Sequence, residues 1–76
     1  MRIEEFKIER PGLVDIGDKV EIVERSTVAF YYYLVLPATA MSGNYPYSER
    51  IKSRTGIVRD IVKNEKGTYL QIEFEN

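Results

Sequence analysis

The chain has no cysteine and no histidine among its 76 residues. The absence of cysteine excludes disulfide bonds and zinc sites built on thiolates. The absence of histidine removes the commonest metal ligand and the commonest general base. Because a chain of this length builds only a thin core, its stability has to come from apolar packing, with self-association as a further source.

Long hydrophobic runs are also absent. The longest apolar stretch, residues 28–36, has nine residues and contains three tyrosines, whereas a membrane-spanning helix needs about 20. Residues 1–5 carry one basic residue with no apolar run after it, so they do not resemble a signal peptide. We therefore expect a cytoplasmic protein without membrane association.

Charge of either sign is missing from the middle of the chain. The net charge is −1, which gives no whole-molecule attraction to nucleic acid or acidic membranes. Residues 1–24 sum to −3, residues 25–63 to +4 and residues 64–76 to −2. Within the basic middle block, the 23 residues from Ser26 to Ser48 carry no charge. This uncharged segment is the most unusual feature of the sequence.

Alternation of apolar and polar residues predicts several short β-strands. The clearest is residues 68–75, and residues 5–9 and 19–24 show the same alternation. For the first of these a helical turn is the competing interpretation, because Ile3 and Phe6 are three residues apart. Residues 27–36 are mostly β-branched or aromatic, so a strand is favoured over a helix there. We expect Phe30, Tyr32 and Leu34 to face the core from that strand.

Loop and turn signals divide the rest of the chain. Pro37 ends the preceding strand, and residues 38–48 have the glycine, proline and asparagine content of a loop. Residues 49–63 read as another strand, with a bend or bulge at Gly56. Residues 64–67, Asn-Glu-Lys-Gly, predict a hairpin turn with its glycine at positive φ.

Five or six short strands without a long amphipathic helix predict an all-β fold. At this length the strands form a small antiparallel barrel. We expect a single domain over residues 1–76, an SH3-like barrel with residues 25–49 as a long insertion between its first and later strands.

Two stretches resemble the KOW-type, SH3-like barrels of translation and transcription proteins. The stretches are residues 16–22, a turn into an alternating strand, and residues 52–62 followed by 69–73. In that family a basic residue or two precedes an obligate glycine, and Gly56 after Lys52 and Arg54 matches this pattern. The family joins the two parts by a short loop, whereas residues 25–49 separate them here. The resemblance covers about half of the chain, and such barrels serve RNA binding, protein binding or scaffolding.

Five basic residues are candidates for nucleic-acid binding: Arg50, Lys52, Arg54, Arg59 and Lys63. The first three share a face if their segment is extended, and cations at that spacing can track phosphates. Tyr45 and Tyr47, close by in sequence, could stack on bases. The competing interpretation is a solvated strand face that is balanced by acidic neighbours such as Glu73 and Glu75.

Four tyrosines are candidates for a protein-binding surface: Tyr31, Tyr33, Tyr45 and Tyr47. Tyrosine is enriched at interfaces because it joins a large apolar body to a polar tip. We expect Tyr31 and Tyr33 on the outer side of their strand, where a protein partner or a second copy in a homodimer would contact them. The alternative is that all four are ordinary surface residues.

Enzyme and metal signatures are missing. The serines lack a base at a motif spacing, and Asp15, Asp18 and Glu21 lack the spacing of an EF-hand. We expect no catalysis, no metal and no cofactor. The leading hypothesis is a non-catalytic binding or assembly module that uses the uncharged tyrosine-rich segment, and the alternative is a nucleic-acid-associated barrel that uses the basic residues.

Overall fold

Six β-strands account for most of the residues that the structure describes. The structure is a computed structural model, and it describes residues 1–9, 12, 14–36 and 40–75. The strands are β1 (Arg2–Ile8), β2 (Lys19–Ser26), β3 (Tyr31–Leu36), β4 (Ala40–Ser42), β5 (Thr55–Asn64) and β6 (Gly67–Phe74). One 3-10 turn, η1 (Tyr47–Glu49), is the helical element of these ranges. No helix in the described residues is long and apolar enough to cross a membrane.

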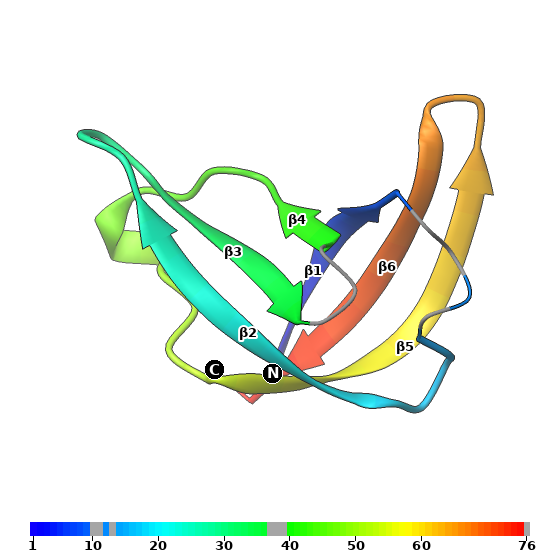
Figure 1. Cartoon of the computed structure of the whole chain (residues 1–76). Coiled ribbons are helices and arrows are strands. Elements are labelled where there is room, and N and C mark those ends of the chain that lie inside the picture. The colour runs from blue at the N-terminus through cyan, green and yellow to red at the C-terminus, as the bar shows by residue number, and fades with distance from the viewer. Residues whose placement is uncertain (10–11, 13, 37–39, 76) are drawn as a thin grey trace.

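The strands close into one antiparallel barrel with the order β1-β4-β3-β2-β5-β6 (Figure 1). β6 pairs with β1 on one side and with β5 on the other. β2 pairs with β5 and β3, and the short β4 links β3 back to β1. The predicted all-β antiparallel barrel is confirmed, and its form is consistent with an SH3-like barrel.

The segment 25–49, predicted as an insertion, contributes two of the six described strands. β3 pairs with β2 along its whole length, and β4 pairs with β3 and β1. The predicted loop over residues 38–48 is wrong at Ala40–Ser42, which alternate buried, exposed, buried as β4. Residues 37–39, including the predicted strand end at Pro37, lie outside the described residues.

The core is formed by one face of each strand. Leu70, Ile72 and Phe74 of β6 are buried, as their alternation predicts. Phe6 of β1 is also buried, with its ring centroid 6.0 Å from that of Phe74. The other buried apolar residues are Ile8, Val14, Val20, Ile22, Tyr33, Val35, Ala40, Ile51 and Val58.

The inward face of β3 is the opposite of the predicted one. Tyr33 is 1% exposed and Phe30 is 46% exposed. The strand begins at Tyr31, because the preceding residues form a turn in which the Thr27 N–H donates to the carbonyl of Phe30 at 2.8 Å. Since residues 28–36 are all apolar or aromatic, their alternation does not specify which face is buried.

β5 begins later than predicted, and its bulge lies after Val58 and not at Gly56. It starts at Thr55, so residues 49–54 do not form a strand. A bulge follows Val58 and changes which later side chains face inward. Ile61 packs against the core and Val62 is exposed, whereas uninterrupted alternation from the buried Val58 would place Val62 inside.

Gly56, where a bend or bulge was predicted, is buried within β5 opposite Val20. A Cβ atom at this position would lie 2.6 Å from Ile72 Cγ2 and 2.7 Å from Phe74 Cε1. Close packing across the barrel therefore requires glycine here. Gly67 has a φ of 141° and follows the β5–β6 turn, which confirms the predicted hairpin.

Candidate functional site

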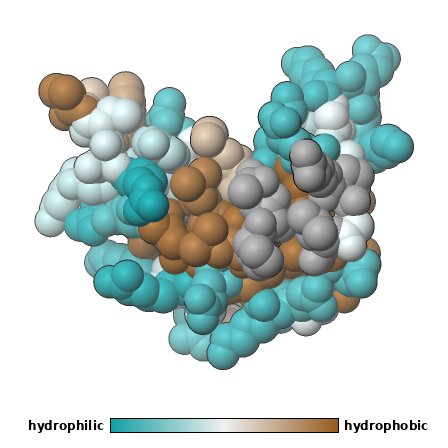
Figure 2. Space-filling view, in the orientation of Figure 1, coloured by the Kyte–Doolittle hydropathy of each residue, from teal (hydrophilic) through white to brown (hydrophobic). Residues whose placement is uncertain are grey.

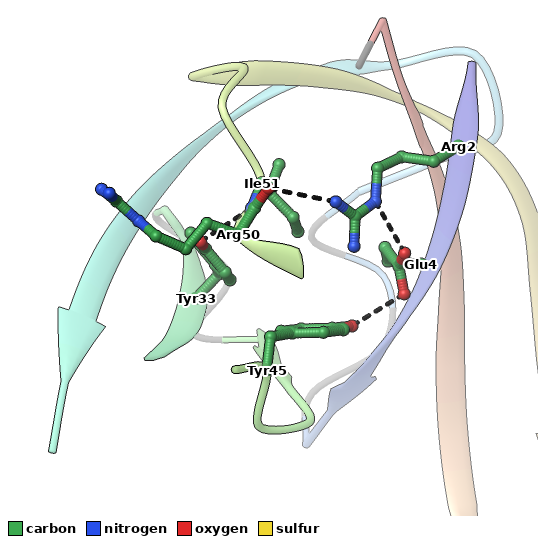
Figure 3. Close-up of polar contacts among 6 residues, drawn as sticks. All are labelled: Arg2, Glu4, Tyr33, Tyr45, Arg50 and Ile51. Atoms are coloured by element: carbon green, nitrogen blue, oxygen red, sulfur yellow. Dashed lines mark hydrogen bonds and ion pairs between the residues drawn. The ribbon is translucent and has the colours of Figure 1, made fainter. Parts of the chain in front are cut away.

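A network of hydrogen-bonded polar groups closes one end of the barrel (Figure 3). We call this end of the barrel the barrel mouth. Strand alternation places Arg2 and Glu4 of β1 on the same face as the buried side chains of that strand, and Glu24 of β2 likewise. The chain from Tyr45 to Ile51 contacts both β1 and β3 at this end. The mouth is therefore built from residues far apart in the sequence.

Tyr33 lies at the centre of the mouth. Its buried hydroxyl donates to Glu24 Oε2 at 2.8 Å and accepts from the backbone N–H of Ile51 at 2.8 Å. Burial raises the pKa of Tyr33, and the hydrogen bond to Glu24 raises it further. The prediction that Tyr33 lies on the outer side of its strand is wrong, so it does not offer its ring to a partner.

Arg50 binds the same carboxylate from the solvent side. Its guanidinium donates to both oxygens of Glu24, at 2.7 and 3.0 Å. Its Cζ lies 4.7 Å from the ring centroid of Tyr31 and 5.3 Å from that of Tyr47. The hydrogen bond from Arg50 lowers the pKa of Glu24, and the carboxylate in turn raises the pKa of Arg50.

A second branch of the network joins β1 to the chain that crosses the mouth. The Arg2 guanidinium donates to Glu4 at 2.8 Å and to the carbonyl of Arg50 at 3.1 Å. The Tyr45 hydroxyl donates to the other oxygen of Glu4 at 2.9 Å. Burial, and then the hydrogen bond to Glu4, raise the pKa of Tyr45.

The mouth network satisfies its own polar groups. Glu24 accepts from Arg50 and Tyr33, and Glu4 accepts from Arg2 and Tyr45. Among the described residues, no buried side-chain nitrogen or oxygen lacks a hydrogen-bond partner. A groove of about 320 Å³ lies beside Glu24 and Arg50. The carboxylate of Glu24 in this groove already accepts three hydrogen bonds, two from Arg50 and one from Tyr33. These charge-assisted hydrogen bonds stabilise the closed mouth and hold the carboxylates of Glu4 and Glu24 in place.

The four predicted tyrosines gather around the mouth in two ring pairs. The ring centroids of Tyr31 and Tyr47 are 6.1 Å apart, and those of Tyr33 and Tyr45 are 6.0 Å apart. Of the four, Tyr47 is exposed, at 71%, while Tyr31 and Tyr45 are half-buried. The structure thus brings the predicted residues together at the mouth, with Tyr33 buried, Tyr31 and Tyr45 half-buried and Tyr47 exposed.

The predicted basic residues are spread over three places. Arg50 lies in the mouth, Lys52 and Arg54 precede β5, and Arg59 and Lys63 lie along β5. The extended segment that would align the first three is not a strand. Arg59 donates to Glu73 at 2.7 Å, which is the kind of cross-strand balance that the competing interpretation predicts.

A groove of about 550 Å³ brings two of these basic residues near the end of β6. Arg54 and Arg59 line this groove together with Lys19. Glu73 and Glu75 line it as well. Its charge is therefore mixed, so an anion in the groove would meet carboxylates as well as cations.

A row of apolar side chains crosses the outer surface of β2, β3 and β4. Val23 lies opposite Leu34, and Leu34 lies opposite Met41, so these three side chains form one row across three strands. Leu36 is 48% exposed and Met41 is 50% exposed. We call Val23, Tyr32, Leu34, Leu36 and Met41 the apolar face.

Figure 2 shows apolar surface on the side where β3 and β4 lie, between the hydrophilic projection of β5–β6 and a second projection whose tip is apolar. Tyr32 and Leu34, predicted to face the core, are half-buried on the outer side of β3 instead. The signal for this surface is the uncharged segment from Ser26 to Ser48, which supplies all of its residues except Val23.

Comparison with known proteins returns no relative. No protein family matches the chain, and no curated protein or solved structure matches it significantly. The fold, the mouth and the apolar face therefore provide the grounds for a functional proposal.

Proposed function

We propose that this protein is a non-catalytic assembly module that binds another protein chain through the apolar face. The row formed by Val23, Leu34 and Met41 carries the proposal. The solvated side of an antiparallel sheet is normally polar, and a contiguous exposed apolar patch marks an interaction site. Removing such a patch from water is favourable by about 25 cal/mol per Å².

The rest of the barrel shows that this apolar surface is a local property. On the outer side of β1 and β6, Gln71 donates to Glu5 at 3.0 Å. Between β5 and β6, Arg59 pairs with Glu73. One sheet therefore presents hydrogen-bonded charges on one side of the molecule and aliphatic side chains on another. This contrast supports an interface that is confined to β2, β3 and β4.

The docking surface differs from the set of tyrosines expected from the sequence. Tyr33 and Tyr45 use their hydroxyls inside the mouth, and Tyr31 packs under Arg50. Their role in binding is to fix the strands that carry the apolar face. Tyr47 remains a candidate for direct contact because it is mostly exposed.

Site-specific photo-crosslinking in cells tests the proposal. A photoreactive residue replaces Leu36 on the apolar face, and a matched variant carries it at Ile3, an exposed aliphatic residue of β1 that is 55% accessible. We expect covalent protein adducts from position 36, few from position 3, and loss of the position 36 adducts when Met41→Lys is added. A thermal unfolding measurement serves as the control that the Met41→Lys variant is folded. Equal adducts at both positions, or adducts insensitive to Met41→Lys, would contradict the proposal.

The alternative is a nucleic-acid-binding barrel, which the resemblance to KOW-type barrels implies. The groove that contains Lys19, Arg54 and Arg59 supports it, and the carboxylates of Glu73 and Glu75 in the same groove weigh against it. Binding of mixed-sequence oligonucleotides that weakens steeply with salt would favour this alternative. No binding at low salt would remove it.

A further inference from the structure

Two opposite charges flank the apolar row at equal distances on β2. Glu21 and Arg25 are exposed, and each lies two residues from Val23 on the same outer side of the strand. At about 3.3 Å per residue, each side chain stands about 7 Å from the row along the strand. On β3, Leu36 and Tyr32 flank Leu34 in the same way, since they pair with these two charged residues.

This arrangement is complementary to itself. In a two-fold dimer the same patch serves both copies, so residue i meets residue j and j meets i. A two-fold axis that runs along the row of Val23, Leu34 and Met41 superposes each copy's row on the other. The same rotation brings Glu21 of one copy to Arg25 of the other, twice per dimer, and it brings Leu36 against Tyr32.

We infer that the partner of the apolar face is a second copy of this chain, docked face to face about this axis. The inference rests on the proposed function, because it assigns the occupant of the same surface. Two sheets packed in this way lie about 10 Å apart, with strand directions within about 30°. The dimer covers the aliphatic row and pairs both flanking charges, so no charge is left buried alone.

Beyond Met41, the next residue in line with the row is Lys7 of β1, and its position is compatible with this dimer. Lys7 lies opposite Met41, and its position on the axis would bring two copies of Lys7 toward each other. Its side chain, however, extends to the β5–β6 hairpin, since an added Cβ at Gly67 would lie 3.1 Å from Lys7 Cε. The contact therefore spans β2, β3 and β4.

The flanking charges favour a second copy over a strongly charged partner. One acidic and one basic residue flank the row, so a highly acidic or highly basic surface would be attracted at one side and repelled at the other. A copy of the same patch, reversed by the two-fold axis, matches both charges. The apolar row also matches itself, because each side chain on the axis meets an identical one.

Sedimentation equilibrium of the purified full chain with charge-exchange variants tests the inference. We expect the wild type to dimerise, and Glu21→Arg or Arg25→Glu each to weaken dimerisation about tenfold or more, because each variant sets like charges against each other. The double variant E21R/R25E restores the dimer. An equimolar mixture of the two single variants dimerises more tightly than either alone, because both contacts are then again of opposite sign.

Matched controls place the same charge changes on the exposed β5–β6 turn. Glu65→Arg and Lys66→Glu alter net charge equally, and we expect them to leave dimerisation unchanged. A dimer that tolerates Glu21→Arg, Arg25→Glu and Met41→Lys uses another surface and overturns the inference.

The two proposals fail in different ways. A chain that is monomeric at millimolar concentration while position 36 still crosslinks to other proteins overturns the second copy and retains the assembly module. A monomer without specific adducts at position 36 overturns both. A dimer that responds to the charge exchanges as expected, with homodimer as the position 36 adduct, supports both.

Discussion

The hairpins β5–β6 and β2–β3, which project on opposite sides of the barrel in Figure 1, distribute their polar groups differently. On β5–β6 the charges lie outside, where Arg59 pairs with Glu73, and the inner side of β6 is largely aliphatic and aromatic. On β2–β3 the outer side carries Leu34 and its neighbours, while Glu24 and the Tyr33 hydroxyl lie inside at the mouth.

This difference shows how one small sheet can hold polar groups on its inner side in one hairpin and on its outer side in another. Inward polar groups are tolerated on β2–β3 because each finds partners within the mouth, and buried polar groups are costly only when unpaired. On the outer surface of that hairpin, aliphatic side chains then lie between the exposed charges of Glu21 and Arg25. On β5–β6 the ordinary arrangement holds, and its outer surface is suited to water. Both hairpins therefore contribute to the fold, and β2–β3 differs in the aliphatic side chains on its outer side.

Removing the inward hydroxyl should have the largest effect on stability. We expect Tyr33→Phe to lower the free energy of unfolding by about 1–3 kcal/mol, because the buried N–H of Ile51 loses its acceptor and Glu24 Oε2 loses one of its two donors. Tyr69→Phe, on the outer side of β6, is the control and should change it by less than about 0.5 kcal/mol. Urea unfolding at pH 7 measures both. Equal losses would show that the mouth is no more dependent on its tyrosine than the outer surface is.

An acid-dependent loss of smaller size is expected from the mouth carboxylate. The hydrogen bond from Arg50 lowers the pKa of Glu24 in the folded chain. Ionised Glu24 therefore stabilises the fold above its unfolded pKa, about 4.3, and this contribution disappears as pH falls through the lower, folded pKa. We expect Glu24→Gln to cost about 1 kcal/mol at pH 7, and progressively less below pH 4.

Urea unfolding at a series of pH values between 7 and 3 checks this expectation. Glu65→Gln, in the exposed β5–β6 turn, serves as the control and should change stability little at pH 7. A difference between wild type and Glu24→Gln that stays constant, or grows, as the pH falls would contradict the assignment of Glu24 to the mouth network.

The parts of the fold that were predictable are those with regular alternation. Residues 68–75 place an aliphatic or aromatic side chain at every second position, so their inner face was correct, and so was the turn before Gly67. Residues 28–36 have no polar residue to mark an outer face, and the sequence could not fix their register. β4 has three residues, which is too short for any periodic signal.

The candidate site was less predictable because its contacts join distant residues. Glu24 and Arg50 are 26 residues apart, and their pairing follows from barrel closure rather than from any spacing. Arg50 therefore looked like a free cation, and Tyr33 like a surface residue. The uncharged segment contains Leu34, Leu36 and Met41 of the apolar face, so the sequence did mark the segment on which the proposed surface lies.

The smallest effect is expected from the outer ion pair of β5–β6. The side chain of Arg59 is 52% exposed, and that of Glu73 is 21% exposed. A double-mutant cycle with Arg59→Ala and Glu73→Ala should give a coupling of about 0.2–1 kcal/mol in urea unfolding, and 1 M salt should reduce it further because exposed pairs are screened. A coupling as large as the loss from Tyr33→Phe would make the outer charges of this hairpin as important to folding as the inward hydroxyl of the other. The two hairpins would then differ in where their polar groups lie but not in how much those groups stabilise the fold. The contrast in polar groups that sets the apolar face apart from the rest of the barrel would then have no counterpart in stability.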